Sequence, residues 1–171
     1  RGGYQRRDDR RGGFQQRDDR RGNFRDDRRK DASYKSYSST DEYVSPNGNE
    51  PTIPAGVSAD ELDRDALRAL TTLSGPNRDI VARHLVMAGQ LIDLDPEAAY
   101  QHAQAAVSRA GRVDVVREAA ALTAYASGRY EEALREVRAV RRMRGDSSLR
   151  AVEADAERGL GHPEKAVEII D

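Results

Sequence analysis

The sequence predicts an all-α domain that follows an N-terminal tail without a hydrophobic core. From Ser58 onward the chain is rich in Ala, Leu, Val, Arg and Glu, residues that are compatible with helices. Apolar residues recur there with helical spacing, and no stretch shows the alternation of a half-buried strand. Before Val44 there is no Val, Ile or Leu. These observations divide the chain into a helical part and a tail.

Composition limits what the chain can do. Hydrophobic residues make up 37% and charged residues 35%, whereas a uniformly folded chain carries about 45–50% apolar residues. The chain has no Cys, which excludes disulfides, thiolate–zinc sites, iron–sulfur clusters and cysteine nucleophiles. No apolar run approaches the ~18 residues of a membrane span, and the first residues lack the apolar stretch of a secretory signal. We therefore expect a cytoplasmic protein with no membrane partner.

The first thirty residues are three decapeptide units, RGGYQRRDDR, RGGFQQRDDR and RGNFRDDRRK. Their aromatic residues, Tyr4, Phe14 and Phe24, are spaced by ten, and Tyr34 continues the spacing. Such a segment cannot bury enough surface to offset the entropy of ordering it. The residues that follow are rich in Ser and Tyr and then in Pro and Gly, which is typical of a linker. We therefore predict a disordered tail and linker over residues 1–56.

Charge is also divided between the two parts. Residues 1–30 contain eleven Arg, one Lys and six Asp, for a net charge of +6, and residues 31–171 have a net charge of −7. A tail and a domain of opposite charge are expected to have different partners.

The decapeptide units resemble the RGG-type segments of nucleic-acid-binding proteins. Arg pairs with phosphates and stacks on bases, and aromatic rings stack on further bases. The Asp pairs depart from this pattern, since they cancel half of the positive charge and repel phosphate. The resemblance implies RNA contacts at Arg1, Tyr4, Arg6, Arg7, Arg10, Arg11, Phe14, Arg17, Arg20, Arg21 and Phe24. Two alternatives stay open: self-association through Arg–aromatic contacts between chains, and a solubilising tail without a specific partner.

Start and stop signals define the helices of residues 57–171. Ser58 and Glu61 have the spacing of a capping box. Gly75-Pro76 interrupts the pattern, and Asp95 followed by Pro is a typical helix start. Later stops are expected at Gly111, Gly128, Gly145 and Gly161. The predicted helices span 59–74, 77–93, 96–109, 113–127, 130–144, 147–159 and 163–171.

An internal repeat resembles the tetratricopeptide repeat (TPR). The segment YASGRYEEALREVRAV places Gly128 at a turn, Tyr130 two residues later and Ala133 early in the next helix. Equivalent small residues, Ala99 and Ala166, lie 34 residues before and 33 residues after Ala133, close to the family period of about 34. The match departs from the family in three places: no Trp opens any unit, Leu94 replaces one turn Gly, and Pro163 replaces one turn aromatic.

The resemblance implies a TPR-like α-solenoid of antiparallel helix pairs, about two and a half repeats with a preceding helix. An Ala-rich helical bundle is the alternative. With 26 Arg against three Lys, the chain is also similar to actinobacterial TPR proteins that have basic low-complexity N-termini. The last helix would expose Val167, Ile169 and Ile170, so we expect further sequence or a docked partner there.

In TPR proteins the first helix of each pair lines a concave groove that binds peptides. The groove positions implied here are His84, Ala88, Leu91, Glu118, Leu122, Tyr125, Asp155 and Arg158. The Lys and Asn residues that clamp peptide carboxylates in chaperone-binding members are missing. A second candidate surface is a cluster of Arg138, Arg141, Arg142 and Arg144. Such a cluster either complements a helix C-terminus or faces phosphate.

No pattern of a catalytic or metal site is present. The three His residues lack the spacing of a zinc-binding helix, and neither a phosphate-binding loop nor a nucleophile elbow occurs. Most helical carboxylates have an Arg three or four residues away, which indicates solvated ion pairs. We therefore expect no enzyme, no cofactor and no metal. The leading hypothesis is an adaptor that binds a protein through the TPR-like domain and RNA through the tail, or self-associates. The alternative is a structural interaction module with an inert tail.

Overall fold

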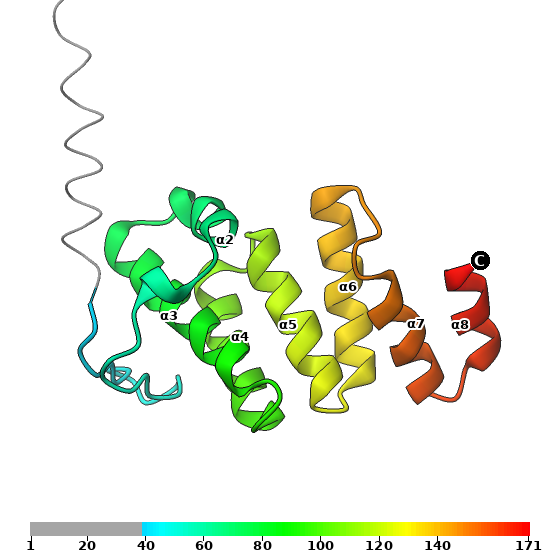
Figure 1. Cartoon of the computed structure of the whole chain (residues 1–171), viewed down its shortest axis with the longest axis horizontal. Helices are drawn as coiled ribbons and strands as arrows, with labels where there is room; N and C mark the ends of the chain where they lie inside the picture. Colours follow the sequence, from blue (N-terminus) through cyan, green and yellow to red (C-terminus); the bar gives the residue numbers. More distant parts are fainter. Residues whose placement is uncertain (1–38) are drawn as a thin grey trace, which may run out of the picture.

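A computed structural model describes residues 39–171 (Figure 1). Within this range the regular elements are helices, and the only strand-like pairing is one isolated antiparallel bridge, so the all-α prediction is confirmed. From α3 onward each helix packs against the next one along the chain. Connections of three to five residues reverse the chain between them. Figure 1 shows the result as a single row, with α2 and α3 at one end and α8 at the other.

The helix boundaries follow the capping signals closely. Pro residues open α3, α4 and α8, and a left-handed Gly145 ends α6 at φ 73°. The elements are η1 (Ala59–Glu61), α2 (Arg64–Ala69), η2 (Leu70–Thr72), α3 (Gly75–Leu91), α4 (Pro96–Ala110), α5 (Asp114–Ala126), α6 (Tyr130–Arg144), α7 (Arg150–Gly159) and α8 (Pro163–Ile170).

The predicted first helix over 59–74 is wrong, because two N-cap signals lie within it. The capping box of Ser58 and Glu61 forms, but it starts only a three-residue 3₁₀ turn. The Asp63 carboxylate then accepts hydrogen bonds from the backbone N–H groups of Asp65 and Ala66, at 3.0 and 3.4 Å. Leu62 between the two caps is extended. The second cap therefore starts α2 in a new direction.

Two further helix starts shift by two or three residues from the prediction. Gly75 and Pro76 belong to the first turn of α3, because Pro is well suited to the first positions of a helix. The start of α7 is later than expected. The Asp146 carboxylate accepts hydrogen bonds from the Ser148 N–H and hydroxyl, at 3.1 and 2.9 Å, and this turn delays the helix.

Residues 39–57 form an ordered strap over α3 and α4, which corrects the predicted linker boundary at residue 56. Tyr43 and Ile53 exchange two backbone hydrogen bonds of 2.9 and 3.0 Å, and the Ile53 side chain is fully buried. Ser39 N–H donates to the Asp79 carboxylate at 3.2 Å, and the buried Arg83 Nε donates to the Val57 carbonyl at 2.8 Å. A few apolar residues are thus enough to dock this segment. The expected disorder of residues 1–38 lies outside the described residues.

The interior of the row is built mainly from Ala. Several of these side chains are fully buried between helices, among them Ala82, Ala99, Ala103, Ala106, Ala120 and Ala133. Small side chains let neighbouring helices approach closely. A still closer approach occurs where Tyr130 at the start of α6 lies against Gly159 of α7, because a Cβ at Gly159 would lie 2.5 Å from the Tyr130 ring. At the far end Val167 and Ile170 of α8 are 59% and 55% exposed, as the sequence predicted, whereas Ile169, which was also expected to be exposed, is half-buried.

Candidate functional site

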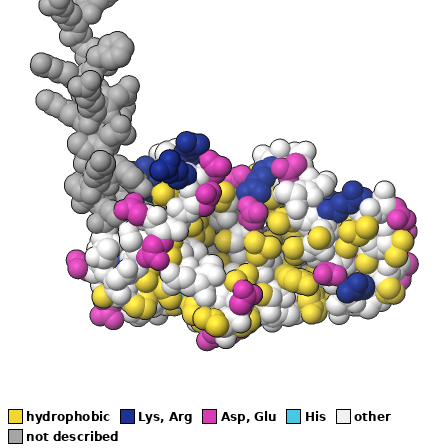
Figure 2. Space-filling model, in the orientation of Figure 1, with side chains coloured by type: hydrophobic (Ala, Val, Ile, Leu, Met, Phe, Trp, Pro, Cys, Tyr) yellow, Lys and Arg dark blue, Asp and Glu magenta, His cyan; other side chains and the backbone are white. Residues whose placement is uncertain are grey.

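A groove lies between α2, α3 and α5. Its volume is about 520 Å³, within the range of pockets that hold small ligands or single large side chains. Its walls are mostly apolar, and its principal apolar lining residues are Leu62, Ala66, Ile92, Val115, Ala119 and Leu122. We call it the α2–α5 groove. In Figure 2 hydrophobic side chains form a band across the middle of this face of the molecule, with charged side chains along its upper edge.

The groove exists because α2 departs from the path of a continuous helix. The Asp63 cap starts α2 separately from the 3₁₀ turn before it, and α2 contacts α5. Ala66 and Ala69 of α2 and Val115 and Ala119 of α5 line the groove. Three of these four side chains are single methyl groups, which leave the space between the two helices open instead of filling it by packing.

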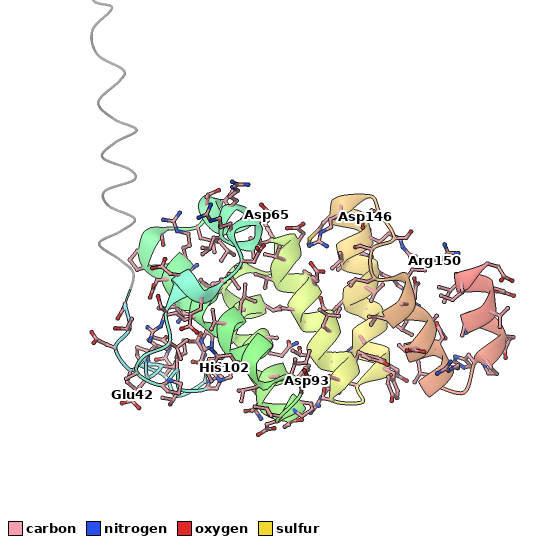
Figure 3. All side chains as sticks on the ribbon, viewed as in Figure 1. Glu42, Asp65, Asp93, His102, Asp146 and Arg150 are labelled. Carbon is pink, nitrogen blue, oxygen red and sulfur yellow. The ribbon has the colours of Figure 1, made fainter. Side chains whose placement is uncertain are left out.

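The rim of the groove is acidic. Asp63 and Asp65 line the α2 side, Asp114 and Glu118 line the α5 side, and Arg144 from α6 is the one basic lining residue. Arg144 is already engaged, since its Nε donates to Asp114 at 2.6 Å and its Nη2 donates to Glu118 at 2.5 Å. In Figure 3 Asp65 lies on α2 at the upper edge of the molecule. The rim therefore keeps an excess of negative charge.

The ion pair also fixes the charged state of Asp114 and Arg144. The hydrogen bond from Arg144 is the main reason why the pKa of Asp114 lies below its usual value, although partial burial opposes the shift. In the same contacts, hydrogen bonds to Glu118 and Asp114 raise the pKa of Arg144. At neutral pH Asp114 and Arg144 are both charged. The groove therefore offers apolar contact at its floor and carboxylates at its edges.

The eight predicted groove positions do not form one surface. Ala88, Glu118 and Leu122 line the α2–α5 groove. Asp155 and Arg158 instead border a second cavity of about 410 Å³ between α7 and α8. Tyr125 lies between the two regions, and its hydroxyl donates to the Asp155 carboxylate at 3.1 Å.

The other two predicted positions, His84 and Leu91, are covered by other parts of the chain. His84 is fully buried, and Leu91 packs on the apolar cluster around Ile53 of the strap. Residues 39–56 were expected to be linker, so nothing predicted that they would cover this end of the row.

Sequence reasoning missed the α2 side of the groove. Asp63, Asp65 and Ala66 were assigned to one long helix, whose carboxylates would face solvent. The signal that could have found them is Asp63 itself. Asp is a strong N-cap residue, and its carboxylate can accept a hydrogen bond from the backbone N–H three positions later, here that of Ala66. Val115 and Ala119 of α5 were also missed, because the family's groove positions named only Glu118, Leu122 and Tyr125 on this helix.

A buried polar cluster holds the strap on the helices. The Nδ1 atoms of His84 and His102 are 2.9 Å apart, so one ring donates a hydrogen bond to the other. On the other side of His84, its Nε2 is 3.8 Å from a Glu50 carboxylate oxygen. Glu50 in turn accepts hydrogen bonds from Arg109 Nε at 2.7 Å and from the Tyr43 hydroxyl at 2.9 Å. Figure 3 shows His102 next to the strap.

The electrostatics of this cluster favour neutral histidines. Burial is the main cause that lowers the pKa of His84 to about 4, and the neighbouring His102 lowers it further. Burial also lowers the pKa of His102. For Glu50, burial acts to raise the pKa, but the hydrogen bonds from Arg109 and Tyr43 outweigh it, so the pKa is lowered. The cluster therefore joins two neutral rings to one Arg–Glu ion pair.

The predicted arginine cluster of α6 is divided by ion pairs. Arg144 pairs with Asp114 and Glu118, and Arg141 pairs with Glu153 of α7. Arg138 and Arg142 are exposed. The pairs attach α6 to the helices on both sides of it, so half of the cluster has a structural role.

No group of three or more His, Cys, Asp or Glu in residues 39–171 is placed to hold a metal ion. No helix in the same range is long and apolar enough to cross a membrane. The predicted RNA-contacting residues, Arg1 to Phe24, lie outside the described part of the chain.

No family model, curated protein or solved structure matches the chain. Its function must therefore be argued from its own residues.

Proposed function

We propose that the chain is a non-enzymatic adaptor whose TPR-like helical array binds a segment of a partner protein in the α2–α5 groove. The row of short helix pairs and the contact of the turn residue Tyr130 with Gly159 support the TPR-like description. The observation that carries the proposal is the groove itself, an apolar cavity of about 520 Å³ with carboxylates along both sides.

The groove suits a peptide better than a metabolite or a substrate. Its floor has no buried, unpaired polar side chain that would orient a small molecule. Its carboxylates stand at the edges, where Lys or Arg residues of a bound peptide would reach them while an apolar residue fills the centre. An extended or helical peptide with one large apolar anchor and flanking basic residues is the ligand that fits this arrangement.

The test is a peptide selection on the full chain with a groove variant and a matched control. Ala119→Arg places a long side chain in the groove, whereas Ala126→Arg places the same side chain on the exposed end of the same helix. We expect selected peptides to bind the wild-type chain and Ala126→Arg equally and to lose at least about tenfold in affinity on Ala119→Arg, a loss of ~1.4 kcal/mol. Circular dichroism establishes that both variants keep their helices. Equal binding to all three chains, or no enriched peptide, contradicts the proposal.

The second part of the proposed function is that the N-terminal repeats bind RNA or self-associate. Residues 39–171 have an excess of acidic over basic residues, so they repel phosphate, and the basic residues of the chain are concentrated in the repeats. The test is fluorescence anisotropy of labelled single-stranded RNA with the full chain and with a variant in which the Arg residues of 1–29 are Ser. Binding that needs these Arg residues and weakens with salt supports the proposal. Equal binding by the variant contradicts RNA binding through the tail, and no binding by either chain leaves a tail that self-associates or is inert.

A further inference from the structure

We infer that the α2–α5 groove is occupied by the chain's own N-terminal repeats, residues 1–30, when no partner is bound. This inference rests on the proposed function, because it names a ligand for the same groove. It makes the tail an internal competitor of the partner, so that the groove becomes available only when a ligand displaces a repeat.

The chemistry of the repeats matches the groove. Each of the first two units places Arg three residues before an aromatic ring and Arg again three residues after it, as in Arg11, Phe14 and Arg17. The groove has an apolar floor for one ring and carboxylates on two opposite sides for the flanking guanidinium groups. Arg binds carboxylates through paired hydrogen bonds, which makes it a suitable partner for such a rim. The two Gly residues before the ring allow the backbone to approach the groove closely.

The rim has carboxylates that the described residues leave accessible. On the α5 side, Arg144 occupies part of Asp114 and Glu118, and these side chains keep 33% and 32% exposure. On the α2 side, Asp65 is 84% exposed and pairs only with the equally exposed Arg68. A surface pair of this kind contributes little and is readily exchanged. An incoming Arg therefore finds exposed acceptors on the α2 side, and on the α5 side it shares the carboxylates with Arg144.

The tail starts close enough to reach the groove within the same molecule. Ser39 is held at α3 by its hydrogen bond to Asp79. The first groove residue of that helix, Leu85, lies six positions after Asp79, a rise of ~9 Å along the helix axis at 1.5 Å per residue. Phe14 lies 25 residues before Ser39, a segment that spans at most about 85 Å and about 28 Å on average. Such a tether gives a millimolar effective concentration. The chain's own tail therefore has an advantage over the tail of a second copy.

Paramagnetic relaxation in the full chain tests the inference directly. The sequence has no Cys, so Gln15→Cys next to Phe14 carries the only spin label. We expect the label to weaken the amide signals of α2 and α5 around the groove, and to leave α7 and α8 unchanged. The control chain carries the same label with Tyr4→Ser, Phe14→Ser and Phe24→Ser, substitutions that remove the anchors and keep every Arg. In this control, and in high salt, the weakening should disappear.

Mixing experiments identify which tail is bound. A chain that carries the spin label but no ¹⁵N is mixed with a ¹⁵N-labelled chain that carries no spin label. Weakening of the groove signals in this mixture means that a second copy supplies the tail, and it overturns the inference. Signals that are unchanged in every sample, or weakened evenly over all helices, overturn it as well.

A titration separates this inference from the proposed function. The probe is a fluorescent peptide of sequence RGGFQQRDDR, added to the full chain and to the triple Ser variant. Release of the internal competitor should tighten binding to the variant about tenfold if the tail occupies ~90% of the grooves. If this peptide binds neither chain, but the selected peptides still lose affinity on Ala119→Arg, the adaptor function stands and the inference fails. If neither kind of peptide binds, both fail.

Discussion

His84 and His102 show how a single pair of side chains sets the conditions under which this end of the molecule stays folded. The Nδ1 atoms of the two rings lie 2.9 Å apart between α3 and α4. Glu50, Arg109 and Tyr43 of the same cluster are joined by hydrogen bonds beside them. Neither ring can gain a proton without leaving a buried charge next to the other. The strap is attached through this cluster, so the protonation of one imidazole affects the docking of a whole segment.

Stability should therefore fall between pH 6.5 and pH 4. The pKa of His84 is lowered to about 4 in the folded chain, compared with about 6.5 when unfolded, so the unfolded chain binds more protons in that window. The contribution of His84 is complete above pH 6.5, decreases as the pH falls, and levels off below pH 4. At pH 5 we expect a loss of about 2 kcal/mol. Urea unfolding at pH 7.5 and pH 5 measures it.

The control for this prediction is His84→Gln, which cannot be protonated. The variant should be less stable than the wild type at pH 7.5, because the packed ring is lost, but its stability should change less between pH 7.5 and pH 5. An equal pH dependence in both chains would show that other groups are responsible.

At the scale of single elements, close packing depends on where the chain has no side chain. Gly159 of α7 lies against the Tyr130 ring, which also packs with Tyr125 at a centroid distance of 6.1 Å. Gly89 of α3 is helical too, but a Cβ there would meet no atom within 4 Å. The two glycines differ in their surroundings and share the same helical backbone.

Substitution by Ala should change the stability in opposite directions at these two positions. Gly89→Ala should stabilise the chain by ~0.5–1 kcal/mol, because Ala is the better helix former and space is available. Gly159→Ala gains the same helix propensity but forces the Tyr130 ring out of its place, and should cost a net ~1–3 kcal/mol. Denaturant unfolding measures both. In a Tyr130→Ala background the cost of Gly159→Ala should vanish, and a cost that persists would contradict the proposed contact.

Element boundaries were predictable where one strong signal decides and unpredictable where two compete. Asp95 followed by Pro96 predicted the first residue of α4 correctly. The region of Ser58 and Asp63 has two good N-caps, and which one leads a helix depends on the packing of Ala59 and Leu62 with distant residues. The groove side of α2 follows from that choice. Half of the candidate site was therefore not predictable from local sequence.

At the scale of the whole molecule, the row of helices distributes stability unevenly. The strap, η1 and α5 all contact α3, whereas α8 packs mainly against α7. Ala166 is the only buried side chain of α8. In such an array each helix depends on its neighbours, so the helix with one neighbour is the least protected. The end at α8 should open before the end at α3.

Hydrogen exchange should therefore be graded along the row. We expect the amides of α3, α4 and α5 to be the most protected, those of α6 and α7 to be intermediate, and those of α8 to exchange first. Native-state exchange measured by mass spectrometry on the full chain resolves these segments. Uniform protection from α3 to α8 would mean that the array unfolds as one cooperative unit.

Arg144 connects the groove to the rest of the row. Arg144 is the last residue of α6, and its side chain reaches Asp114 and Glu118 of α5. The two α5 carboxylates that form part of the rim therefore also attach α6 to α5. A cationic ligand that binds Glu118 competes with Arg144 for it. Filling the groove should therefore weaken the hold of α5 on α6, and an occupied molecule should differ from an empty one in how its two halves bend relative to each other.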